Sequence, residues 1–130
     1  MRIRCCSLEL PQDLLRPRVA KLQGRWPVVV HAEYRVLAVE QRDGLWFATF
    51  EHNEREMPVS APIALFEIVD ASVSPFWNIR LRGEEVALQP IEFDDEFFSD
   101  DVQERRGDAL ERYRAMKVRL DGESIAMETT

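Results

Sequence analysis

Seven carboxylates fall within thirteen residues of the C-terminal third of the chain, in the run E-F-D-D-E-F-F-S-D-D-V-Q-E from Glu92 to Glu104. No lysine or arginine interrupts this run, and three phenylalanines are interleaved with it. Carboxylates at this density suit a surface that binds a cationic partner, with a phenylalanine as a desolvated anchor. The sequence therefore nominates a set of partner-binding residues: Glu92, Asp94, Asp95, Glu96, Phe97, Phe98, Asp100, Asp101 and Glu104.

Other interpretations of the same run lead to other chemistry. It could be the solvated start of a helix, with aspartates that complement the helix dipole and aromatic rings that pack inward. An EF-hand calcium loop needs a glycine after its alternating acids, and the run has none. A two-metal nuclease site also uses carboxylates, but no lysine or histidine stands nearby. We expect no bound metal and no cofactor.

The acidic run accounts for the net charge of the chain. Of the 24 acidic residues, seven lie in the run, and the other 17 match the 17 lysines and arginines, so the formal charge of −7 resides in one segment. Nucleic-acid binding needs concentrated Lys and Arg, which an acidic chain with a pI near 4.9 does not offer. The composition therefore favours a basic protein as the partner.

Residues typical of catalysis are isolated in this sequence. The five glycines are scattered, so neither a P-loop nor a dinucleotide fingerprint is present. The two histidines, His31 and His52, stand alone, and no Gly-x-Ser-x-Gly motif occurs. Cys5 and Cys6 are adjacent, which suits neither an ordinary disulfide nor a zinc site. We expect a protein that is not an enzyme.

Alternating apolar residues predict a sheet that must position the acidic run. Strands are expected at residues 34–40, 45–50, 65–69, 77–81 and 86–88, the last ended by Pro90. Asp43-Gly44, between two apolar runs, predicts a tight hairpin. A set of residues should be largely buried: Tyr34, Val36, Phe47, Phe66, Ile68, Trp77, Ile79, Tyr113 and Met116.

The C-terminal third predicts helices. Ala109, Tyr113, Met116 and Leu120 repeat at helical spacing, which indicates an amphipathic helix over residues 108–121 that ends at Gly122. A separate helix is expected over residues 94–106, with a kink at Gly107 between the two. The expected organisation is one domain over residues 1–123, with a sheet core at about 32–90, a helical part at about 94–121 and a frayed tail at 124–130.

The N-terminus contains no apolar segment of the secretory kind, and no window approaches a membrane span. With two thiols expected in a strand, these features favour the cytoplasm and argue against a membrane partner. The fold of residues 1–31 is the least defined by the sequence, although residues 2–8 could form a first strand.

The segment Pro62-Ile63-Ala64-Leu65-Phe66-Glu67-Ile68-Val69-Asp70 keeps a P-x-x-L-F-E-I-V-D spacing, and it follows the strands A-E-Y-R-V-L-A-V-E and L-W-F. Residues 32–82 thereby resemble a group of short bacterial and phage proteins, mostly uncharacterised, some of which sit among toxin-immunity genes. The resemblance implies an SH3-like, strongly bent small barrel within an α+β fold, with a C-terminal amphipathic helix packed on its antiparallel sheet. It nominates no site residue, and His31-Ala32-Glu33 departs from the Gly-Lys entry of the group.

Two classes of function follow from these observations. The first is a non-enzymatic inhibitor of the immunity or antitoxin type, which uses its acidic surface to block a basic partner enzyme such as a nuclease toxin. The second is a bacterial or phage accessory module that binds other proteins through a groove, with the acidic run only solvating a helix.

Overall fold

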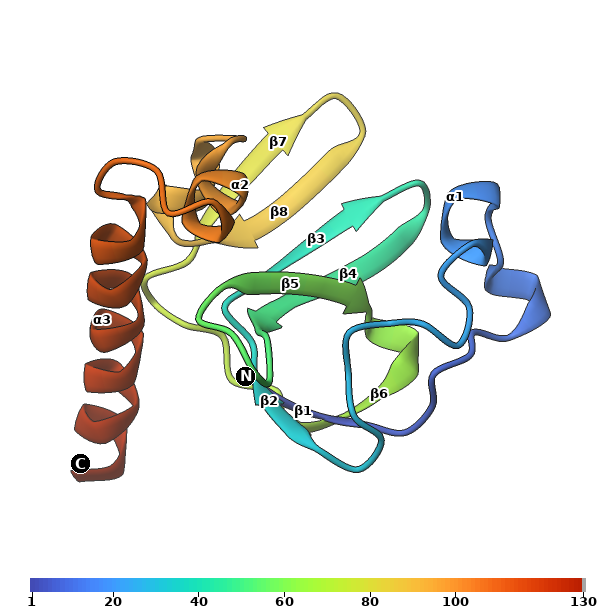
Figure 1. Cartoon of the computed structure of the whole chain (residues 1–130). Coiled ribbons are helices and arrows are strands. Elements are labelled where there is room, and N and C mark those ends of the chain that lie inside the picture. Colours follow the sequence, from blue (N-terminus) through green and yellow to red (C-terminus); the bar gives the residue numbers. More distant parts are fainter. Residues whose placement is uncertain (130) are drawn as a thin grey trace.

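The computed structural model describes the backbone of residues 1–129 and the side chains of residues 1–122. Strands and helices follow one another along the chain, with three short 3-10 turns (η) between them (Figure 1). The elements are β1 (Arg2–Cys5), η1 (Gln12–Leu14), α1 (Pro17–Ala20), β2 (Glu33–Arg35), β3 (Ala38–Arg42), β4 (Leu45–Glu51), β5 (Pro58–Pro62), η2 (Ile63–Leu65), β6 (Phe66–Asp70), β7 (Asn78–Arg82), β8 (Glu85–Gln89), η3 (Ile91–Asp94), α2 (Phe98–Gln103) and α3 (Ala109–Thr129).

The strands form two antiparallel sheets. The smaller has the order β2-β1-β6, and the larger has the order β5-β4-β3-β8-β7. The fold is therefore α+β, as expected, but the hydrogen bonds of the described residues form two sheets and close no barrel. The strand expected at residues 34–40 is divided between the sheets, because the chain bends at Val36 and Leu37. Those two residues enter different hydrophobic cores.

The hairpin that joins β3 to β4 has the geometry that its sequence predicts. Asp43 and Gly44 have φ angles of 51° and 75°, and Arg42 pairs directly with Leu45. Two central residues with positive φ define a type I′ turn, whose twist matches that of the flanking strands. The β7–β8 hairpin is also closed by two residues, with Arg82 paired to Glu85 and Gly83 at a φ of 59°.

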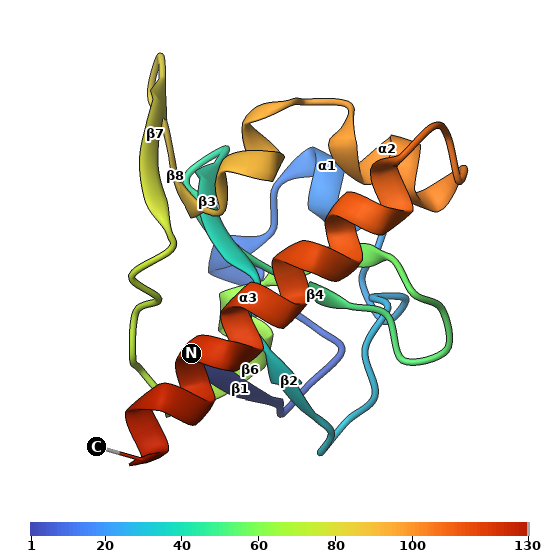
Figure 2. The ribbon, with the colours of Figure 1, turned by 90° about the vertical axis from the view of Figure 1, so that its left-hand side faces the viewer.

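Two hydrophobic cores hold the molecule together. The larger lies among the two sheets and the N-terminal segment, and includes Ile3, Tyr34, Phe50, Leu65 and Trp77. The second joins α2 and α3 to the strands, and consists of Leu37, Phe98, Val102, Ala109, Tyr113, Met116 and Leu120. The apolar stripe expected on the C-terminal helix is thus confirmed. Figure 2 shows α3 crossing in front of the strands.

Two residues expected in the core lie at the surface. Ile79 on β7 is 70% exposed and Ile68 on β6 is 52% exposed. Both strands are sheet edges, and the alternation of apolar residues tells which side chains share a face without telling whether that face is covered. Trp77 is buried as expected, but it immediately precedes β7 instead of lying in it.

The helices differ from the sequence expectation in length. The segment 94–106 contains the last residue of η3, a turn and the short α2, and Gly107 with a φ of 52° separates α2 from α3. The C-terminal helix does not end at Gly122, because α3 continues to Thr129. The tail expected at 124–130 is therefore helical up to Thr129, and its side chains lie outside the described residues.

Candidate functional site

The acidic run occupies η3, the following turn and α2, which lie beside the larger sheet (Figure 1). The side chains of Asp94, Asp95, Glu96, Asp100 and Glu104 are exposed, whereas Glu92 and Asp101 are half-buried. The run is thus partly buried at Glu92 and Asp101 and open to solvent over most of its length. We call the exposed set Asp94, Asp95, Glu96, Phe97, Asp100 and Glu104 the acidic surface.

Glu92 faces the interior and does not belong to this surface. Arg119 of α3 donates from Nη2 to Glu92 Oε1 over 2.7 Å and from Nη1 to Oε2 over 3.0 Å. Desolvation acts to raise the pKa of Glu92, but the hydrogen bonds from Arg119, a backbone hydrogen bond and the positive charges of Arg119 and Arg112 together outweigh it, so the pKa lies below its ordinary value. Glu92 is held as a carboxylate against α3, where a partner could reach it only by opening this contact.

Arginines from outside the run neutralise part of its charge. Arg82 of β7 lies 3.4 Å from Glu96, and Arg106 pairs with Glu104 and lies 3.9 Å from Asp101. These exposed pairs are weak, because solvent screens them and long side chains lose freedom when they pair. The structure thus places counter-charges where the sequence showed an uninterrupted acidic run.

Three aspartates of the run, by contrast, form no ion pair with any described side chain. Asp94 accepts a hydrogen bond from Gln89 Nε2 at 2.9 Å, and Asp95 accepts one from the backbone N–H of Phe97 at 3.0 Å. Asp100 lies in the first turn of α2, where its charge complements the helix dipole. The remaining negative charge of the acidic surface is therefore concentrated at these three positions.

The two candidate anchor residues have opposite environments. Phe98 is only 1% exposed and packs in the second core, edge-to-face with Phe93 at a centroid distance of 5.5 Å. It cannot contact a partner in this conformation, so its nomination as a surface anchor is wrong. Phe97 is 61% exposed and has Asp95 and Glu96 before it in the chain. Phe97 is the aromatic residue of the run that a partner could cover.

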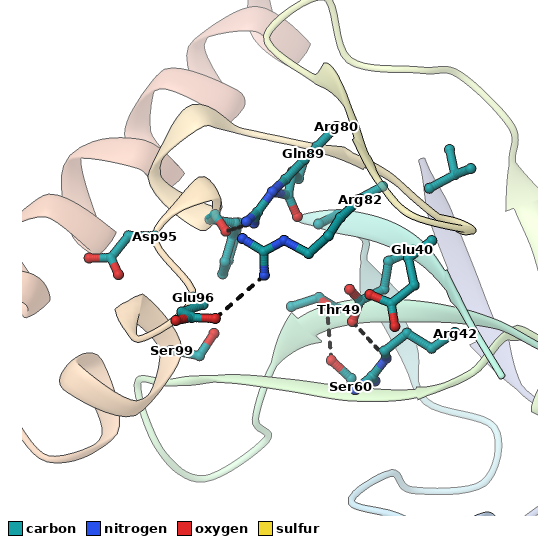
Figure 3. A pocket seen from close by; sticks show the side chains of 15 residues that line it. Glu40, Arg42, Thr49, Ser60, Arg80, Arg82, Gln89, Asp95, Glu96 and Ser99 are labelled. Atoms are coloured by element: carbon teal, nitrogen blue, oxygen red, sulfur yellow. Dashed lines mark hydrogen bonds and ion pairs between the residues drawn. The ribbon is translucent and has the colours of Figure 1, made fainter.

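A polar cavity of about 340 Å³ adjoins the acidic surface (Figure 3). One side is the sheet face that carries Arg42, Arg80 and Arg82, and the other is formed by the η3–α2 segment, with Asp95 and Glu96. Figure 3 shows the Arg82 guanidinium directed across the cavity toward Glu96. This cavity is not among the features predicted from the sequence, although the alternate polar positions on β3 and β7 are a signal for it.

Charged groups of the cavity wall contact one another. Arg42 Nε lies 3.0 Å from Glu40 Oε1, and Arg80 donates to the Phe93 carbonyl oxygen at 3.3 Å. The hydroxyls of Thr49 and Ser60 are 2.9 Å apart. With its cations and carboxylates opposed in this way, the cavity can bind a polar group by complementary contacts. Among the described residues, no group of His, Cys, Asp and Glu is arranged to hold a metal ion.

The isolated histidines and cysteines take up local positions. His31 has a φ of 74° in a turn, and His52 Nδ1 accepts a hydrogen bond from the Glu54 N–H at 3.0 Å. Cys5 is buried in β1, where desolvation raises the pKa of its thiol, and Cys6 is exposed. A raised pKa makes the Cys5 thiol a weaker nucleophile.

No protein-family model, no curated protein and no solved structure matches this chain. The functional conclusions therefore rest on the geometry of the described residues. Within that part of the chain, no helix has the length and apolar character needed to cross a membrane.

A network of ion pairs joins α3 to β4 and to the loop that follows β4, and its residues line a second cavity. Lys117 Nζ lies 2.6 Å from Glu51 Oε1 and 3.0 Å from Glu56 Oε2, and Arg114 Nη2 lies 2.7 Å from Glu56 Oε1. Hydrogen bonds from Arg114 and then Lys117 lower the pKa of Glu56 from 4.5 to about 2. Tyr113 donates to Glu51 Oε1 at 3.2 Å, and burial is the main reason that its pKa is raised. We assign this network to the docking of α3.

Proposed function

We propose that this chain is a non-enzymatic, protein-binding inhibitor of the immunity or antitoxin type, which acts in the cytoplasm. Its acidic surface covers a basic partner enzyme such as a nuclease toxin. One observation carries the proposal: Asp94, Asp95 and Asp100, which form no ion pair with any described side chain, flank the exposed ring of Phe97 in one short segment.

The charges and the ring have different roles in this proposal. Unpaired surface charge mainly accelerates the encounter with an oppositely charged protein, and this effect weakens as salt rises because the Debye length is only about 8 Å at physiological ionic strength. Stable binding requires in addition the burial of an apolar anchor, and Phe97 is the exposed aromatic residue at this place. The aspartates should therefore set the association rate, and Phe97 the dissociation rate.

The non-enzymatic part of the proposal is supported by the state of the polar groups. The three arginines that line the cavity each contact a carboxylate or the backbone, and the thiol of Cys5 has a raised pKa in the core. His52 Nδ1 is engaged by the backbone. None of these groups is arranged as a nucleophile with an adjacent base.

We further propose that the two sheets are an opened form of the SH3-like arrangement that residues 32–82 resemble. Two features support this: the chain bends between β2 and β3, and η2 makes a second change of direction between β5 and β6. In both places one segment of chain leaves one sheet and enters the other. An experimental structure that does not superimpose on SH3-like barrels over these strands would contradict this part of the proposal.

The function is tested by affinity capture with matched variants. The chain is immobilised and exposed at low salt to an extract of the cells that produce it, next to the triple variant Asp94→Asn, Asp95→Asn, Asp100→Asn and to Phe97→Ala. Asparagine keeps the side-chain oxygens that accept from Gln89 and from the Phe97 N–H. The control Glu9→Gln, Glu54→Gln, Glu111→Gln removes the same charge from exposed positions elsewhere.

The expected result is a basic protein that the wild type and the control retain and that both site variants lose. With that protein purified, the triple variant should associate about tenfold more slowly at low salt, and the difference should shrink at high salt. Phe97→Ala should mainly accelerate dissociation, and the wild type should inhibit the activity of the partner. An association rate that the aspartate changes leave unaltered, or a partner that is not inhibited, would contradict the inhibitor function.

A further inference from the structure

Strand β7 forms an open edge of the larger sheet. It is the last strand in the order β5-β4-β3-β8-β7, and β8 is the described element against which it packs extensively. Figure 2 shows β7 at the outer margin of the molecule, with no other element beyond it. The opposite edge is different, because β5 carries Pro58 and Pro62 and packs against α2. Proline has no N–H to donate to a further strand. The β5 edge is therefore protected against pairing with another strand, whereas the β7 edge is not.

Exposed apolar side chains lie along this edge. Ile79 and Leu81 are 70% and 72% exposed, and they share a sheet face with their cross-strand partners Leu88 and Val86. The row that contains Ile79 continues through Leu88 to Val39, which is buried in the larger core. The core face of the sheet thus extends outward to β7, where the described part of the chain leaves its apolar side chains exposed to solvent.

The free backbone groups of β7 belong to the same two residues. A hairpin closed by two residues makes its flanking pair hydrogen-bonded, which is here Arg82 with Glu85. Because hydrogen-bonded and non-hydrogen-bonded pairs alternate, Arg80 bonds to β8, whereas Ile79 and Leu81 direct their N–H and C=O groups to the open side. No backbone hydrogen bond of the described chain uses those outward groups. At Ile79 and Leu81, the edge therefore combines backbone groups that can pair with a further strand and exposed apolar side chains.

We propose that β7 is the contact between two copies of this chain, which pair antiparallel across a two-fold axis and join their five-stranded sheets into one. The axis passes beside Ile79, so that Ile79 lies opposite Ile79 of the partner subunit. A non-polar pair then occupies the core face at the centre of the interface. This interface goes beyond the proposed inhibitory function and does not depend on it.

The arginines of β7 select this register. An axis at Arg80 would place two guanidinium groups directly opposite each other, and like charges in that position destabilise a strand pair. With the axis at Ile79, Arg80 lies opposite Asn78 of the partner subunit, which can accept its hydrogen bonds, and Leu81 lies opposite the partner's Trp77. The edge is therefore complementary to itself in both charge and polarity, which is what a second copy requires.

Sedimentation velocity over a wide range of protein concentration tests the association. The wild type should become dimeric as the concentration rises, whereas the double variant Ile79→Lys, Leu81→Lys should stay monomeric. Both positions are exposed, so the variant should keep the circular dichroism and melting temperature of the wild type. The matched control is Ile68→Lys on the β6 edge, which is also exposed and should leave the dimer intact. A monomeric wild type at every concentration, or a dimer that survives the double variant, would overturn the proposal.

Cysteine cross-linking tests the register in a Cys6→Ser background, which removes the exposed native thiol and leaves Cys5 buried. Asn78 and Arg80 would face each other as a non-hydrogen-bonded pair, with Cα atoms about 4.5 Å apart, which a disulfide can bridge. Mild oxidation of an equal mixture of Asn78→Cys and Arg80→Cys should give mainly the mixed dimer. If Arg80→Cys alone cross-links to itself more efficiently, the axis lies at Arg80 and the proposed register is wrong.

Discussion

Arg119 of α3 and Glu92 of η3 form a bidentate ion pair, with N–O distances of 2.7 and 3.0 Å. Only 11% of the Glu92 side chain is exposed. The pair joins the first residue of the acidic run to a helix that begins 17 positions later in the chain. Because guanidinium and carboxylate meet in a planar fork, the contact fixes the orientation of η3 as well as its distance from α3. The contact between Arg119 and Glu92 therefore holds the acidic surface in a fixed position relative to α3.

Arg119→Lys should lower the free energy of unfolding by about 1–3 kcal/mol, because an ammonium cannot make both bonds and hydrogen bonds to a shielded charged group are strong. Urea unfolding at neutral pH measures the change. Arg106→Lys, at an exposed pair with Glu104, is the control and should cost about 0–1 kcal/mol. Equal costs for the two variants would show that the Glu92 contact is no more than a surface ion pair.

Trp77→Ala should lower the free energy of unfolding by about 3–5 kcal/mol, because a large buried side chain is removed from the main core. Its buried indole N–H has no hydrogen-bond partner among the described residues, so the expected loss comes from packing. Thermal and urea unfolding measure the effect. Trp46→Ala, at a tryptophan on β4 that is 41% exposed, is the matched control and should cost less. A change of only a degree or two in the melting temperature of Trp77→Ala would contradict this placement.

Gly44→Ala and Gly122→Ala should change stability in opposite directions. Gly44 has a φ of 75° in the β3–β4 turn, where an L-residue is strained by about 1–2 kcal/mol. Gly122 lies within α3, and a Cβ at that position would meet no atom within 4 Å, so alanine should stabilise the helix by about 0.5–1 kcal/mol. Urea unfolding of both variants checks the pair. A destabilising Gly122→Ala would indicate that the helix ends at this glycine.

Acid should weaken the contribution of the Glu56 network. The pKa of Glu56 is about 2 in the folded chain and 4.5 ordinarily, so its folded pKa is depressed. The stability that this carboxylate contributes is therefore fully present above pH 4.5 and is lost as the pH falls from 4.5 through about 2. Urea unfolding of wild type and Glu56→Gln should show a difference at neutral pH that shrinks over that range. Glu54→Gln, outside the network, should show no such trend.

Local signals predicted much of the fold. Asp43-Gly44 defined its turn, because positive φ at two successive residues is a local property that the sequence states directly. The stripe of Tyr113 and Met116 defined the buried face of α3 for the same reason. The predictions that were wrong concern features that depend on packing between residues far apart in the sequence. Nothing near Ile79 indicates that the core stops short of β7, and nothing near Gly122 indicates that the helix continues.

For the candidate site, too, local features were predicted and features set by distant contacts were not. The acidic run and its interleaved phenylalanines were visible in the sequence, but its counter-charges were not, because Arg82 and Arg119 come from separate elements. Phe97 and Phe98 are adjacent and chemically identical, so composition could not tell which ring is buried. The direction of α2 relative to the second core decides this.

Strand β1 lies in the centre of the smaller sheet, between β2 and β6. Its partner residues in β6, Phe66–Asp70, are made more than sixty positions after it. During synthesis, β1 therefore emerges long before one of its two neighbours exists, and it must wait with Ile3 and Cys5 unpacked. Bringing the two strands together requires closing a long loop, which is entropically slow relative to the local hairpins. The smaller sheet should thus be the late step of folding, completed only after the β3–β4 hairpin and the bend at Val36 have formed.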